Sequence, residues 1–137
     1  MDGNILKKYG TIEECPVRNV LDRIGDKWSL LVLMVLEDGG VLRFNELNGY
    51  ITNISQKMLT VTLKSLEADG LVKRTVYAQI PPKVEYELTS TGKSLLPHLH
   101  TLTEWALKNM ASIKTSRKSY ELASGHRVLK SAKLIDL

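Results

Sequence analysis

The chain has 137 residues, 43% of them hydrophobic and 25% charged, which is enough for one domain with a buried core. Its single cysteine, Cys15, excludes an internal disulfide and a cysteine-based zinc site, and this fits a reducing compartment. No apolar run is long enough to span a membrane, and the N-terminus lacks the apolar centre of a signal peptide. We therefore expect a cytoplasmic protein without membrane association, cofactor or metal.

The net charge of +4 is concentrated at one end of the chain. Residues 1–113 contain 13 Lys and Arg and 13 Asp and Glu, whereas residues 114–137 contain six basic and two acidic residues. We expect residues 1–113 to form the folded domain and residues 114–137 a basic tail, either a helical extension or disordered. Any contact of the domain with nucleic acid must therefore come from local clusters of cations.

Two helices are predicted in the first third of the chain. Pro16 suits a first helical turn, and the apolar residues Val17, Val20, Leu21 and Ile24 then recur at helical spacing. Asp26 is expected to cap a second helix, in which residues 28–36 are apolar on nearly every side. Such a helix belongs at the centre of a domain. The Glu-Asp-Gly-Gly segment at 37–40 is predicted to be a turn.

The pattern from residue 41 to residue 88 is that of a helix-turn-helix followed by a hairpin. A short strand is predicted at 41–44, and Asn45 is expected to cap a short helix. After a turn at 52–54, Ser55 caps a second helix that ends at Asp69, before a glycine. Strands are predicted at 71–78 and 84–88, joined by a loop containing two prolines.

Thr89 is expected to cap a long last helix whose pattern fades beyond Lys114. This order of elements predicts an α+β, mainly α, fold, namely a winged helix-turn-helix. The second helix of such a unit usually enters the DNA major groove.

The helix at 55–69 has two different sides at 100° per residue. One side carries Leu59, Thr62, Leu63 and Leu66, which we expect to face the core. The other side carries our candidates for DNA contact by the recognition helix, which are Ser55, Gln56, Lys57, Thr60, Val61 and Lys64. Such groups contact phosphates, base edges and the thymine methyl. An ordinary solvated helix has a similar polar side, so the helix-turn-helix and hairpin around it decide in favour of DNA.

Four further cations are candidates for DNA contact. Lys73, Arg74 and Lys83 lie in the hairpin, the wing of the fold, and Arg43 precedes the first helix of the motif. Arg43 fits either a flanking phosphate or a plain surface charge.

These segments resemble the HxlR family of bacterial winged-helix, MarR-like transcription regulators. The matching motifs are CPVRNVLDRIGDKW at 15–28, RFNEL at 43–47, ISQKMLT at 54–60, LKSLEADGLVKR at 63–74 and PPKVEYELTSTG at 81–92. The resemblance covers about residues 14–108. It departs at Asn53, where the family commonly has glycine, and asparagine tolerates a left-handed backbone better than most residues.

The resemblance implies a homodimer on a palindromic operator, held by its N-terminal helix region and its long C-terminal helix. The C-terminal helix independently carries an apolar stripe, from which we take Leu99, Leu102, Trp105 and Met110 as candidates for the dimer interface. The alternative is that this stripe only completes the core of one chain.

Cys15 occupies the position at which some HxlR relatives sense oxidants or electrophiles. A helix N-terminus favours the thiolate form of cysteine. With one thiol per chain, reaction would give a Cys15–Cys15 bridge between subunits, a mixed thiol adduct or an alkylated cysteine. A buried cysteine without a signalling role is an equally good interpretation.

The leading hypothesis is a homodimeric, sequence-specific regulator that binds double-stranded DNA and responds to oxidants or electrophiles. One alternative is a regulator of the same fold that binds a small apolar ligand near Trp28, Tyr50 or Trp105. Another is a winged helix used only for protein contact. We do not expect an enzyme, because the sequence suggests no catalytic pairing of nucleophile and base.

Overall fold

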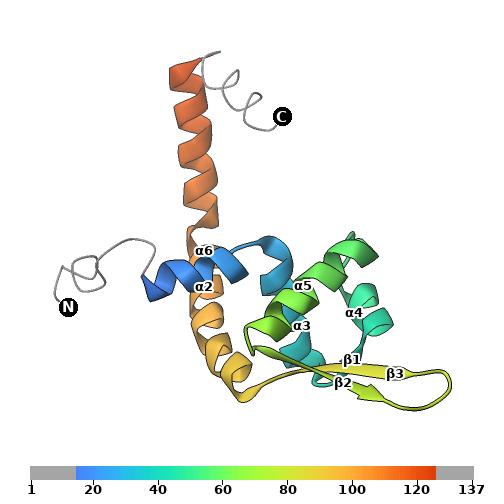
Figure 1. The fold of residues 1–137 in the computed structure, drawn as a ribbon. Coiled ribbons are helices and arrows are strands. Elements are labelled where there is room, and N and C mark those ends of the chain that lie inside the picture. The colour runs from blue at the N-terminus through green and yellow to red at the C-terminus, as the bar shows by residue number, and fades with distance from the viewer. Residues whose placement is uncertain (1–14, 126–137) are drawn as a thin grey trace. The chain divides into compact units, whose positions relative to one another are not determined.

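The computed structural model describes residues 15–125. Its elements, in chain order, are α2 (Pro16–Ile24), α3 (Lys27–Gly39), β1 (Leu42–Arg43), α4 (Phe44–Tyr50), α5 (Gln56–Ala68), β2 (Val72–Tyr77), β3 (Lys83–Leu88) and α6 (Ser90–Ser124) (Figure 1). The helix pair α4–α5 followed by the β2–β3 hairpin confirms the predicted winged helix-turn-helix. The contacts divide the chain into two units at Pro97, within α6.

The three strands form one antiparallel sheet in the order β1-β3-β2. Leu42 of β1 lies opposite Tyr86 of β3, and Val72 of β2 lies opposite Leu88. All four side chains are buried. Since directly paired residues point to the same side of a sheet, this side faces the core and the alternate residues face away from it.

The core of the first unit lies among α3, α4, α5 and the sheet. Helix α3 packs against α5 and β3, as expected for a helix that is apolar nearly all round. The most deeply buried apolar side chains have at most 2% of their surface exposed and include Val32, Leu33, Leu36, Leu47, Leu59, Leu63, Leu66, Val72 and Leu96.

Three of the predicted helix caps are confirmed. The carboxylate of Asp26 accepts the N–H groups of Trp28 and Ser29 at 3.0 and 2.9 Å. The hydroxyl of Ser55 accepts the N–H of Met58 at 3.0 Å, and that of Thr89 accepts the N–H of Gly92 at 3.0 Å. Each bond satisfies a backbone donor that the first turn of a helix leaves unpaired.

The predicted cap at Asn45 is wrong, because α4 begins one residue earlier, at Phe44. The N-cap residue is Arg43, whose backbone N–H donates to Oε1 of Glu46 at 3.0 Å. The side chain of Glu46, at the third position of the helix, therefore accepts the N–H of the N-cap residue, which is one of the two hydrogen bonds of a capping box.

Two helices run beyond the point at which their sequence pattern ends. Helix α3 continues through the expected turn to Gly39, against which the side chain of Leu42 lies, and ends before Gly40, whose φ is 75°. Helix α6 continues past Lys114 to Ser124 and stops at Gly125, whose φ is 60°, so residues 114–124 form the helical extension that was one of the two alternatives. Residues 114–124 contain no Gly or Pro, so nothing interrupts the helix before that glycine.

The turn between α4 and α5 contains Asn53, the residue at which the chain departs from the pattern of the family that it resembles. Asn53 has a φ of 70°, the left-handed conformation that asparagine tolerates.

Within residues 15–125, no helix combines the length and the apolar character that crossing a membrane requires.

Candidate nucleic-acid interface

Helix α5 separates its two sides as the sequence predicts. Leu59, Thr62, Leu63 and Leu66 are buried, with exposed fractions of 0 to 4%. On the opposite side Lys57, Val61 and Lys64 are exposed, as are Ser55 and Gln56 at the N-terminal end. Thr60 is half-buried. All six candidates from the recognition helix therefore lie off the core.

The two lysines of α5 differ from the paired cations elsewhere in the described part of the chain. Within residues 15–125 neither Lys57 nor Lys64 forms an ion pair, although four other cations of the chain do. An ammonium group without a protein partner keeps its full charge available to a phosphate. This leaves the exposed side of α5 locally cationic in a domain whose bulk charge is balanced.

Thr60 uses its hydroxyl within the helix. Its Oγ1–H donates to the backbone carbonyl of Gln56 at 2.8 Å, one turn earlier. In this arrangement the hydroxyl oxygen keeps its acceptor lone pairs, and the methyl group is the other part of the side chain that a ligand can contact.

The wing divides its cations between its two faces. Lys73 lies opposite Glu87 and pairs with it at 3.8 Å, and Lys83 pairs with Glu85 at 2.7 Å. The Lys83 ammonium also lies 5.0 Å from the ring centre of Tyr77. These residues alternate with the buried positions of their strands, so they lie on the face away from the core.

Arg74 lies on the other face of the wing. It is opposite Tyr86 and shares its side of β2 with Val72, both of which are buried, whereas Arg74 itself is exposed. Since β2 packs against α5, this cation is on the same side of the sheet as the candidate recognition helix. Figure 1 shows the hairpin extending past α4 and α5. Arg43, by contrast, pairs in register with Glu85 on the outer face.

Helix α2 exposes most of its apolar side. Val17, Val20 and Leu21 are 61, 46 and 54% exposed, and Ile24 is the only residue of the helix that is buried. Cys15, at the N-cap of α2, is 8% exposed. The helical spacing indicated this apolar side, but the sequence did not reveal that three of its residues lack cover in one chain.

The candidate dimer residues on α6 differ in exposure. Leu102 and Trp105 are 54 and 56% exposed, Met110 is half-exposed, and Leu99 is buried. Two of the four candidates, Leu102 and Trp105, are therefore exposed, whereas Leu99 is buried.

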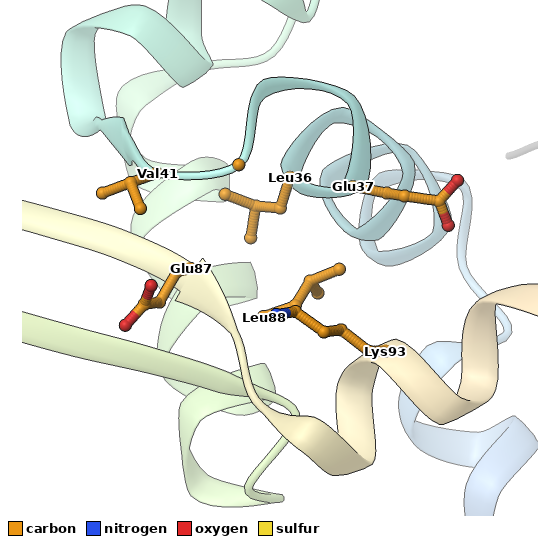
Figure 2. A pocket seen from close by; sticks show the side chains of 7 residues that line it. Leu36, Glu37, Val41, Glu87, Leu88 and Lys93 are labelled. Carbon is orange, nitrogen blue, oxygen red and sulfur yellow. The ribbon is translucent and has the colours of Figure 1, made fainter.

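A pocket of about 390 Å³ lies on another part of the first unit (Figure 2). It is bounded by the end of α3, by β3 and by the start of α6, and is lined by Leu36, Glu37, Gly40, Val41, Glu87, Leu88 and Lys93. None of Trp28, Tyr50 and Trp105, near which a ligand was considered, lines it. Among the described residues, no group of three or more His, Cys, Asp or Glu side chains could hold a metal ion.

The sequence profile of the HxlR-like helix-turn-helix family matches residues 23–114. The chain belongs to this family. An HTH-type transcriptional regulator of Methanothermobacter thermautotrophicus is 52% identical to this HxlR-like chain over 91 residues, which are 66% of the chain and 69% of the relative. These relationships make the chain a helix-turn-helix transcription regulator rather than an enzyme.

Two solved structures of regulators resemble the HxlR-like chain. The redox regulator HypR in its reduced form has a TM-score of 0.68 and 44% identity, and the match covers 73% of this chain and 98% of HypR. The reduced transcriptional regulator YodB of B. subtilis has a TM-score of 0.61 and 39% identity, and the match covers 67% of this chain and 90% of YodB. HypR has also been solved in an oxidised form.

Sequence reasoning missed two features of the HxlR-like site. The carboxylates Glu85 and Glu87 neutralise two of the three wing cations, and the alternation of Lys, Glu and Glu at every second position of β3 was the available signal. Arg23, in the last turn of α2, bonds to Asp69 at the end of α5. No local pattern connects residues 46 positions apart.

Proposed function

We propose that this HxlR-like regulator is a homodimer that binds a palindromic operator through α5 and releases or engages it when Cys15 is modified. The observation that carries the proposal is the exposed side of α5, where Lys57 and Lys64 have no carboxylate partner among residues 15–125 and lie opposite a fully buried side. On the second helix of a helix-turn-helix, this combination suits the phosphates and base edges of the major groove.

The contacts with DNA divide into two groups. Gln56, Thr60 and Val61 are assigned to base edges, and Ser55, Lys57 and Lys64 to the flanking backbone. On the wing, we assign the phosphate contact to Arg74 rather than to Lys73 or Lys83, because those two lysines already have carboxylate partners. Arg43 is assigned to a flanking phosphate.

Exposed apolar side chains support the dimer. Val17, Val20 and Leu21 form such a surface on α2, and Leu102 and Trp105 form another on α6. Rows of large apolar side chains in water are typical of protein interfaces. One recognition helix reads only a few base pairs, so a two-fold pair of chains doubles the site and requires a palindrome.

The redox part of the proposal draws on the position of Cys15 and on the likeness to the redox regulator HypR. Cys15 is 8% exposed, so a reagent would reach its sulfur only after a local movement of the residues that cover it. Two Cys15 thiols that form a bridge lose two electrons and two protons to the oxidant, and a quinone would become a hydroquinone. The bridge requires the two Cα atoms to lie within about 7 Å.

The test is binding of the purified protein to DNA from upstream of its own gene, at fixed salt, with and without diamide. We expect a change in affinity that dithiothreitol reverses and that Cys15→Ser abolishes. Mass spectrometry of the oxidised sample distinguishes a bridged dimer from a mixed adduct, and sedimentation gives the oligomeric state.

Three other results would each contradict a different part of the proposal. A response that persists in Cys15→Ser would move the signal to a small-ligand site. A monomer that binds DNA would remove the dimer and the palindrome. Failure to prefer any sequence, including sequences selected from a random DNA pool, would favour a winged helix used for protein contact.

A further inference from the structure

A polar contact joins the end of α2 to the end of the candidate recognition helix. Nε of Arg23 donates to Oδ2 of Asp69 at 2.9 Å. Arg23 lies in the last turn of α2, and Asp69 is the C-cap residue of α5. The side chains are 47 and 31% exposed, so the pair lies at the edge of the domain rather than in its core.

The electrostatics of this contact differ from those of an ordinary surface pair. The C-terminal end of a helix carries a partial negative charge, which makes it an unfavourable place for the carboxylate of Asp69. The guanidinium of Arg23 lies near the ends of both α2 and α5 and offsets both partial charges. The hydrogen bond that Arg23 donates to Asp69, and then the negative charge of Asp69, raise the pKa of Arg23 above its ordinary value.

Helix α2 packs against α3 and α5, and Cys15 at its N-cap is buried. Of residues 16–24 only Ile24 is buried, and Ile24 and Arg23 are adjacent at the same end of the helix. The directional bond from Arg23 to Asp69 limits the angles that α2 can take relative to α5, because a planar guanidinium donates well only over a narrow range of partner positions.

We propose that Arg23 and Asp69 are positioning residues, which fix the angle between α2 and α5 and thereby the separation of the two recognition helices in the dimer. This inference rests on the homodimer proposed above, with α2 in its interface. Two recognition helices must reach major grooves about 34–36 Å apart. A small change in the angle between α2 and α5 in both subunits would therefore change which half-site spacing fits.

The experiment measures affinity as a function of half-site spacing. A palindromic duplex with the selected half-sites is lengthened and shortened one base pair at a time, and each duplex is titrated at fixed salt. The proteins are wild type, Arg23→Gln, Asp69→Asn and the exchanged pair Arg23→Asp with Asp69→Arg. Arg18→Gln is the matched control, because it removes an arginine of α2 that pairs within its own helix, with Asp22 at 3.9 Å.

We expect wild type and Arg18→Gln to prefer one spacing. In Arg23→Gln and Asp69→Asn this preference should fall by about threefold or more, while the affinity for an isolated half-site stays unchanged. The exchanged pair should recover part of the preference. A purely structural role would not give this result, since it would weaken all duplexes, including the half-site, alike.

Two results would overturn the inference and are distinguishable from each other. If wild type shows no spacing preference, the homodimer on a palindrome fails and the positioning role fails with it. If wild type has a sharp preference that Arg23→Gln and Asp69→Asn retain, the positioning role alone is wrong. Should Arg23→Gln not fold, Arg23→Lys, which keeps the charge but not the planar fork, is judged by the same criterion.

Discussion

The ammonium group of Lys83 lies 2.7 Å from Oε1 of Glu85, two positions further along the same strand. Residues two apart in a strand point to the same face, so the pair forms on the outer face of the wing, beside the cross-strand pair of Lys73 and Glu87. The wing thus keeps Arg74 as its cation without a carboxylate partner among the described residues. We expect the contribution of the wing to DNA binding to be limited by its own carboxylates.

Removing those carboxylates should tighten DNA binding. Glu85→Gln and Glu87→Gln free Lys83 and Lys73, and each freed cation that reaches a phosphate should steepen the dependence of log affinity on log salt by about 0.9. Arg74→Gln should weaken binding and make that dependence shallower by a similar amount. The measurement is a titration of operator DNA at several salt concentrations. If Lys83→Gln weakens binding as much as Arg74→Gln, the paired lysine contacts DNA after all.

On the recognition helix, Lys57→Ala should weaken binding to all DNA sequences alike, because a lysine on a phosphate carries no base information. Thr60→Ala should weaken binding to the operator more than binding to unrelated DNA. Lys93→Ala is the matched control, since it removes the same charge from the pocket at the start of α6 (Figure 2). Equal losses in Lys57→Ala and Lys93→Ala would mean that bulk charge, and not the α5 surface, governs affinity.

Two glycines in helices should respond oppositely to alanine. A Cβ on Gly92 would clash with the carbonyl oxygen of Leu71, so Gly92→Ala should force the start of α6 away from the hairpin and lower the free energy of unfolding by about 1–3 kcal/mol. A Cβ on Gly49 of α4 meets nothing within 4 Å, and Gly49→Ala should stabilise by about 0.4–1 kcal/mol. Urea unfolding monitored by circular dichroism gives both values. Similar losses in the two variants would contradict this account of α6.

Stability should fall in acid partly through Asp26. Burial raises the pKa of this carboxyl, but the hydrogen bonds from Ser29 and Trp28 outweigh burial and leave the pKa below its ordinary value. The cap therefore stabilises the fold fully above about pH 4, and this contribution is lost as the pH falls through the lower pKa of the folded state.

Asp26→Asn isolates this contribution, because asparagine also caps helices but does not titrate. The free energy of unfolding of wild type should fall more steeply below about pH 4 than that of the variant. At neutral pH, Asp26→Ala should cost about 0.5–2 kcal/mol. Parallel curves for wild type and Asp26→Asn would assign the acid sensitivity to other carboxylates.

The parts of the fold that depend on neighbours in sequence could be predicted. Asp26, Ser55 and Thr89 cap helices through bonds to residues two or three positions away, and the buried side of α5 follows from helical spacing alone. The extension of α3 to Gly39 could not be predicted, since it involves packing of Leu42 against that glycine. Helical spacing also grouped Val17, Val20 and Leu21 on one side of α2 without revealing that this side is uncovered.

The candidate DNA-binding site likewise has parts that could be predicted from the sequence and parts that could not. Lys57, Thr60 and Lys64 could be placed on the exposed side of α5 from spacing, but the state of the wing cations depends on strand register, which pairs Lys73 with Glu87. The bond between Arg23 and Asp69 depends on how two distant helices pack. Helical spacing therefore predicts on which side of α5 these side chains lie. Their ion pairs and long-range hydrogen bonds depend on the tertiary structure and could not be predicted.

The bond from the Thr60 hydroxyl to the carbonyl of Gln56 has a consequence for the operator. With its hydrogen committed to the backbone, Thr60 can meet a base only as an acceptor or through its methyl group. In the major groove, the amino groups of adenine and cytosine are the donors, and thymine offers a methyl. We therefore expect the base pair that Thr60 contacts to be an A·T pair, or to have cytosine on the contacted strand. Where Thr60 contacts adenine, replacing this adenine with purine, which lacks the amino group, should weaken binding.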